Sequence, residues 1–83
     1  MEYVKLNGQF PKLGRSAVTL GKFDGIHRGH RKLIRTILER KKEYGELAVV
    51  MAFISDRQTI LTSEERQTYL EKMGVDVLLE CPL

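Results

Sequence analysis

Residues 47–54 of the chain read Leu-Ala-Val-Val-Met-Ala-Phe-Ile, an apolar run without interruption. A strand that faces water on one side alternates apolar and polar residues, whereas an unbroken run rich in β-branched side chains is typical of a strand buried on both faces. Such strands occur mainly in parallel sheets covered by helices. The run is too short to cross a bilayer, which takes about 20 residues. It therefore predicts an inner strand of a parallel α/β sheet.

The residues before this run predict a strand followed by a helix. Residues 16–21 read Ser-Ala-Val-Thr-Leu-Gly and have the composition of a strand. From residue 29 to residue 44 an apolar stripe recurs at steps of three and four, which is the period of a helix. The stripe consists of Leu33, Ile34, Ile37 and Leu38. Gly45 follows directly, and glycine is a frequent helix stop.

A second helix and a third strand are predicted after a loop over residues 55–61. Thr62 and Glu65 have the spacing of a capping box, in which each side chain accepts a hydrogen bond from the backbone amide of the other residue. Gly74 ends this helix, and Val75–Leu79 reads as the third strand. The residues that we expect in the core on the apolar face of the helix are Tyr69, Leu70 and Met73.

The elements follow one another as β-α-β-α-β, the order of a parallel sheet with right-handed crossovers. The sequence thus predicts an α/β fold with a three-layer, Rossmann-like (HUP-type) parallel sheet, of which this chain forms a half or a fragment. The third strand would leave an apolar edge uncovered. We therefore expect either a domain that is incomplete at its C-terminal end or a homo-oligomer formed through this uncovered sheet edge.

Composition excludes several classes of protein and points to an anionic ligand. The 83 residues are 42% hydrophobic and 30% charged, which suits one small globular domain and no disordered or collagen-like protein. Cys81 is the single cysteine, so we expect a buried structural thiol in a reducing, cytoplasmic setting. Residues 1–45 hold eleven Lys and Arg against four acids, and residues 46–83 hold three against seven. The asymmetry favours an anionic partner for the first half, although a solvated basic helix face gives the same pattern.

The segment Gly21 to His30 joins the first strand to the first helix. It reads Gly-Lys-Phe-Asp-Gly-Ile-His-Arg-Gly-His, which matches neither the P-loop nor the dinucleotide-binding glycine pattern. Counted back from the apolar stripe, His27 and His30 lie on the sheet side of the helix start. This position is beyond the carboxyl end of a strand, where open parallel sheets bind ligands.

The chemistry of this position favours a nucleotide phosphate. The amides of a first helical turn carry partial positive charge, and imidazoles add hydrogen-bond donors. Gly29 allows close approach to the backbone, and Gly21 and Gly25 permit the sharp passage from strand to helix. Histidines can also act as polar caps and glycines as turn residues. Their combination with a strand end and local basic charge favours the phosphate site.

Residues 20–30 as a whole resemble the signature of the FMN adenylyltransferase module of bacterial FAD synthetases. Those enzymes are bifunctional riboflavin kinase/FMN adenylyltransferases of the His-x-Gly-His nucleotidyltransferase superfamily. Residues 49–53, 61–66 and 70–76 are similar to the next strand, helix and strand of the family, and residues 6–13 to its N-terminal lead-in. His-x-Gly-His alone would also suit pantetheine-phosphate or glycerol-phosphate nucleotidyltransferases. The longer pattern favours flavin, and another phosphorylated acceptor stays an open alternative.

The resemblance implies a nucleotidyltransferase-like domain over residues 1–83 that transfers AMP from Mg-ATP to FMN, giving FAD and pyrophosphate. It implies that His27 and His30 are catalytic and act on the triphosphate. Mg²⁺ would be held mainly by the substrate phosphates, with no side chain assigned as a metal ligand. Riboflavin kinase activity and a membrane partner are not expected. The residues that the resemblance assigns to the binding cleft are Gly21, Phe23, Asp24, Gly25 and Gly29, although Asp24 suits a turn-capping role equally well.

The chain departs from the family after Phe53. Where the family has a Pro-His-Pro loop, residues 54–58 read Ile-Ser-Asp-Arg-Gln, and Lys22 stands where Asn is common. The family's later Ser/Thr and Arg triphosphate motif does not occur in these 83 residues. The alternative is therefore a truncated, non-catalytic nucleotide-binding or dimerisation module. Nucleic-acid binding by the basic residues of the first helix is disfavoured, because no aromatic residues are interleaved with them.

Overall fold

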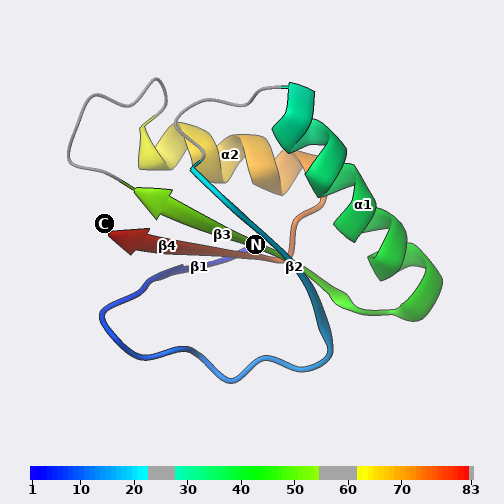
Figure 1. Ribbon diagram of the computed structural model, residues 1–83, viewed down its shortest axis with the longest axis horizontal. Helices are drawn as coiled ribbons and strands as arrows, with labels where there is room; N and C mark the ends of the chain where they lie inside the picture. The colour runs from blue at the N-terminus through cyan, green and yellow to red at the C-terminus, as the bar shows by residue number, and fades with distance from the viewer. Residues whose placement is uncertain (23–27, 55–61, 83) are drawn as a thin grey trace.

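The computed structural model describes residues 1–22, 28–54 and 62–82 (Figure 1). Its elements, in chain order, are β1 (Glu2–Lys5), β2 (Ser16–Gly21), α1 (Arg28–Tyr44), β3 (Leu47–Ile54), α2 (Ser63–Met73) and β4 (Val77–Pro82). The four strands are parallel and lie in the order β1-β4-β3-β2. The predicted Rossmann-like, parallel α/β fold is confirmed.

The run at residues 47–54 forms β3, an inner strand between β2 and β4. Ala48 and Val50 face the helices, and Val49 and Met51 belong to a second apolar cluster on the opposite face. Three of these four residues are completely buried, and Met51 is nearly so. The prediction of a strand buried on both faces is therefore confirmed.

Both helices cover one face of the sheet (Figure 1). Ile34 and Ile37 of α1 pack with Leu70 of α2 in the cluster beneath them. α1 begins one residue before its predicted start, and Gly45 follows it with a φ of 68°. Leu33 was expected on the buried stripe, but 47% of it is exposed, because it lies one step around the helix from Ile34. Among the described residues, no helix is long and apolar enough to cross a membrane.

The third predicted strand lies inside the sheet, so the expectation of an uncovered edge there is wrong. β4 runs from Val77 to Pro82 rather than over 75–79, because Val75 and Asp76 belong to the turn after α2. β1, which the sequence analysis did not predict, pairs with β4 from Glu2 opposite Val77 to Lys5 opposite Glu80. The outer strands of the described sheet are therefore β1 and β2.

The connection between β1 and β2 covers part of the face opposite the helices (Figure 1). Leu6 is buried there, and Leu13 and the half-buried Cys81 pack around it, so Cys81 is not the fully buried thiol that was expected. Val18 and Leu20 lie opposite Val49 and Met51 in register and therefore point to this face. They are 48% and 56% exposed, so the apolar cover does not extend over β2.

Candidate functional site

The carboxyl ends of the strands and the first turns of both helices meet at one edge of the sheet. Because all the described strands are parallel, Gly21, Ile54 and Pro82 end their strands on the same side. α1 follows β2 and α2 follows β3, so each helix begins at this side (Figure 1). Open parallel sheets bind their ligands at this edge, which makes it the candidate site.

The first turn of α1 carries basic residues and one of the predicted histidines. His30 is half-buried, and Ile34, four residues later on the same helix face, is completely buried. His30 therefore lies on the sheet side of α1. The first turn of α1 contains no acidic residue, and Arg31 is exposed beside it. Within α1 itself, the basic residues of the first turn add to the partial positive charge of the helix start.

The structure places only some of the predicted site residues. Gly21 is the last residue of β2, and Gly29 lies next to His30 in the first turn of α1. These three residues frame the passage from strand to helix. The other predicted site residues lie outside the described residues, and their assignment stays a prediction; they are Phe23, Asp24, Gly25 and His27.

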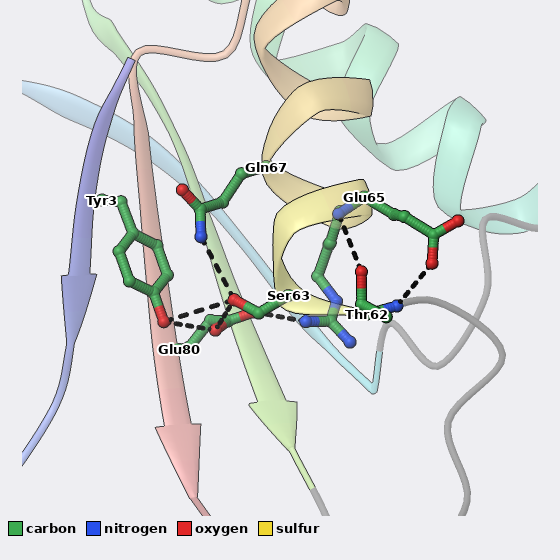
Figure 2. A network of polar contacts seen from close by, with 7 residues as sticks. Tyr3, Thr62, Ser63, Glu65, Gln67 and Glu80 are labelled. Atoms are coloured by element: carbon green, nitrogen blue, oxygen red, sulfur yellow. Dashed lines mark hydrogen bonds and ion pairs between the residues drawn. The ribbon is translucent and has the colours of Figure 1, made fainter.

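The first turn of α2 is neutralised by its own side chains. Thr62 Oγ1 accepts a hydrogen bond of 3.1 Å from the Glu65 amide, and Glu65 Oε1 accepts one of 3.0 Å from the Thr62 amide. The predicted capping box is therefore confirmed (Figure 2). The bond from the Thr62 backbone is the main reason that the pKa of Glu65 lies below its usual value. Glu64 adds a second acidic residue to this turn.

Beside this turn, a network of polar contacts joins β1, α2 and β4 through the buried carboxylate of Glu80 (Figure 2). Glu80 Oε1 accepts hydrogen bonds from Tyr3 Oη at 2.6 Å and from Ser63 Oγ at 2.7 Å. Glu80 Oε2 pairs with the guanidinium of Arg66. Gln67 Nε2 donates to Ser63 Oγ at 3.2 Å. Arg66 is 1% exposed and Glu80 is 5% exposed, so the ion pair is shielded from water.

The donors around Glu80 favour its charged form. Burial by itself raises the pKa of this carboxyl group, but the bonds from Tyr3, Ser63 and Arg66 outweigh burial and hold the pKa below its usual value. Burial and the hydrogen bond to Glu80 raise the pKa of the Tyr3 phenol. At neutral pH the network therefore consists of a carboxylate, a guanidinium and neutral hydroxyl groups.

A cavity of about 240 Å³ adjoins this network. Its lining residues come from the ends of β1, β3 and β4 and from the start of α2, and are Tyr3, Lys5, Ile54, Ser63, Glu80 and Pro82. It lies at the same edge of the sheet as the candidate site, and none of its lining residues belongs to α1. The sequence analysis missed it because two of its residues belong to the unpredicted β1.

A signal for the buried pair was nevertheless present in the sequence. Glu80 follows two leucines in an apolar strand, and Arg66 lies four residues before Leu70 on one helix face. Opposite charges on two buried faces indicate an ion pair. The buried residues of α2 are Arg66 and Leu70. Tyr69, which was expected in the core, is only half-buried and belongs to neither apolar cluster, and Met73 packs at the margin of one.

The chain is similar to known proteins in sequence and in fold. Residues 10–83 match the sequence model of the family described as FAD synthetase. The bifunctional riboflavin kinase/FMN adenylyltransferase of Escherichia coli (strain K12) is 31% identical over 81 residues, which is 86% of this chain and 26% of that protein. The FAD synthetase of Listeria monocytogenes is 33% identical over 83% of this chain and 32% of its own length.

Among solved structures, the crystal structure of a macrolide-efflux protein from Streptococcus pneumoniae is similar to this one, with a TM-score of 0.84 and 27% sequence identity. The match covers 99% of this chain and 37% of that one. The chain thus spans about a quarter to a third of the length of the curated relatives named above.

Proposed function

Since this chain belongs to the FAD synthetase family, we propose that it binds Mg-ATP at the first turn of α1 and transfers AMP to FMN, giving FAD and pyrophosphate. The observation that carries the proposal is the position of His30. It lies on the sheet side of a helix start without acidic residues, at the edge where parallel sheets bind ligands. Phosphate groups are the ligands best matched to free amides and basic side chains at a helix start.

In the proposed reaction a phosphate oxygen of FMN attacks the α-phosphorus of ATP. A bond forms between these atoms, the bond from the α-phosphorus to the oxygen bridging to the β-phosphorus breaks, and pyrophosphate leaves. The reaction needs no covalent enzyme intermediate, so positioning and charge stabilisation account for the catalysis. His27 and His30 would donate hydrogen bonds to the triphosphate as negative charge shifts toward the leaving group.

Magnesium enters this proposal as part of the substrate Mg-ATP. Within residues 1–22, 28–54 and 62–82 there is no cluster of three or more His, Cys, Asp or Glu side chains that could hold a metal ion. Mg²⁺ keeps several waters and is commonly bound by substrate phosphates with one or two carboxylates. The role of this chain is therefore to hold the phosphates, which in turn hold the ion.

A non-catalytic nucleotide-binding module is the second candidate function. It is favoured by the sequence after Phe53, where residues 54–58 lack the Pro-His-Pro loop of the family. Both candidates require nucleotide binding at α1, and they differ in turnover. We place both in the cytoplasm, where ATP and FMN occur. Homo-oligomer formation stays an untested prediction, and the uncovered third strand on which it was based is an inner strand.

A binding titration and a turnover assay together test the proposal. The purified chain is titrated with Mg-ATP by calorimetry, and it is incubated with Mg-ATP and FMN while FAD is followed by chromatography. FAD formation at roughly 1 s⁻¹ or faster supports the transferase, because typical enzymes reach such rates. Nucleotide binding without FAD formation supports the non-catalytic module. Absence of any nucleotide binding contradicts both.

A further inference from the structure

We infer that Glu80 is a positioning residue for the acceptor substrate, because it holds Tyr3 and Ser63 in the wall of the cavity at the ends of β1, β3 and β4. The inference rests on the proposed function, which requires two substrates at one edge of the sheet. It adds that the residues around Glu80 act on the acceptor alone, whereas the first turn of α1 acts on the nucleotide.

The hydrogen bonds of Glu80 fix two side chains that line the cavity. One oxygen, Oε1, accepts from both Tyr3 Oη and Ser63 Oγ, at 2.6 and 2.7 Å, so both hydroxyl groups are oriented by the same atom (Figure 2). Tyr3 comes from β1 and Ser63 is the first residue of α2. Glu80 therefore sets the distance between an outer strand and a helix start on two sides of the cavity.

Stability alone is a weak reason for this arrangement. Replacing a buried ion pair by well-packed apolar residues is often neutral or stabilising, because both charges lose their hydration. The Arg66–Glu80 pair is nevertheless buried beside the cavity, with the second carboxylate oxygen bound to hydroxyl groups rather than to apolar neighbours. An apolar replacement could not orient these hydroxyl groups. We take this directional role as the function of the carboxylate.

The strand order separates the cavity from the first turn of α1. α1 follows β2, whereas the cavity lies over the ends of β3, β4 and β1. Neighbouring strands are about 4.8 Å apart, so the ends of β2 and β4 are separated by roughly 10 Å. A nucleotide phosphate at α1 therefore leaves this cavity to the second substrate, on the same edge of the sheet.

The polar groups of the cavity suit an anionic, hydroxylated acceptor. Arg66 compensates the charge of Glu80, and Lys5 adds an exposed ammonium group to the lining. The hydroxyl protons of Tyr3 and Ser63 are donated to Glu80, so their oxygens are left to accept hydrogen bonds from hydroxyl groups of a ligand. A phosphorylated acceptor with hydroxyl groups matches this combination, and FMN is the probe for the experiment.

Asp76 supplies a matched control at the amino-terminal ends of the strands, away from the candidate site. Its carboxylate accepts hydrogen bonds of 2.8 Å from Lys41 Nζ and from the Ala48 amide. It precedes β4, whereas Glu80 lies near the end of this strand. Asp76→Asn therefore weakens a comparable carboxylate network while leaving the ligand-binding edge intact.

The test measures the affinities for ATP and FMN separately in the full chain, by calorimetry for Mg-ATP and by flavin fluorescence for FMN. Glu80→Gln leaves Arg66 without its carboxylate partner and loosens the hold on Tyr3 and Ser63. We expect it to weaken FMN binding about tenfold and to leave ATP affinity within about twofold. Tyr3→Phe keeps the Arg66–Glu80 pair and should fold normally, and it should weaken FMN binding about threefold. Asp76→Asn should lower Tm and leave both affinities within about twofold.

Three outcomes would overturn the inference. If Glu80→Gln and Asp76→Asn weaken both ligands in proportion to the stability that they lose, the network is structural only. If the unmodified chain binds ATP but not FMN, the cavity does not serve the acceptor, while nucleotide binding at α1 stands. If the unmodified chain binds neither ligand, the proposed function fails, and the inference fails with it.

Discussion

The two helices of this protein begin at the same edge of the sheet, yet their first turns have opposite chemistry. α2 begins with a complete capping box and two acidic residues, so its amides and partial positive charge are balanced within the chain. α1 has no acidic residue in its first turn and carries arginines there instead. A helix start of the first kind stabilises the fold. A start of the second kind favours an anion from outside the chain.

The largest expected effect concerns the network beside α2. Arg66→Ala leaves the buried carboxylate of Glu80 without its cation, and breaking a buried pair in this way costs about 3–5 kcal/mol of unfolding free energy. Urea denaturation followed by circular dichroism measures the loss. The double variant Arg66→Met with Glu80→Leu removes both charges and should recover most of the stability. If Arg66→Ala is as stable as the unmodified chain, the Arg66–Glu80 ion pair does not hold the fold together as described.

At the start of α1 we expect an effect on binding rather than on folding. His30→Ala removes a donor to the triphosphate, and hydrogen bonds to charged groups contribute about 1.5–3 kcal/mol, so ATP affinity should fall tenfold or more. His27→Ala should act in the same direction. Calorimetry measures the affinity, and thermal unfolding shows whether the fold persists. If both variants bind ATP as tightly as the unmodified chain, neither histidine contacts the triphosphate.

At the start of α2, we expect the corresponding substitution to affect folding rather than nucleotide binding. Thr62→Ala deletes the hydroxyl group that accepts a hydrogen bond from the Glu65 amide. Loss of an N-cap side chain typically lowers the free energy of unfolding by about 1 kcal/mol. Tm should therefore fall while ATP affinity stays the same. A loss of nucleotide affinity equal to that of His30→Ala would show that the two helix starts are not functionally distinct.

A smaller effect is expected in the pH dependence of stability. The pKa of Glu80 is lower in the folded chain than its usual value, so its contribution is fully present above the unfolded pKa of about 4.3 and is lost as the pH falls through the folded pKa. Urea unfolding between pH 3 and about pH 7 measures this loss of unfolding free energy in acid. In Glu80→Gln the free energy of unfolding should fall less steeply as the pH is lowered. Asp76, whose pKa is also lowered, should account for part of the remaining loss.

The difference between the helix starts could be predicted from the sequence, because capping boxes and first-turn charges involve residues three or four positions apart. Thr62 and Glu65 show this for α2, and the acid-free segment around His30 shows it for α1. The end of β2 at Gly21 was predicted correctly, and the start of α1 was predicted within one residue. The Glu80 network was not predicted, because its donors come from residues 14, 17 and 77 positions away.

The sequence by itself determined β2, β3 and both helices, because their signals are short-range: an unbroken apolar run, a stripe of period 3.6, a capping box and a terminal glycine. Only the tertiary structure decided that β1 is a strand and that β4 is an inner one. Glu2–Lys5 carries charged residues at both ends and becomes a strand by pairing with Val77–Glu80, far along the chain. Such pairing depends on the free backbone groups of a distant strand, and no local pattern of four residues specifies that partner.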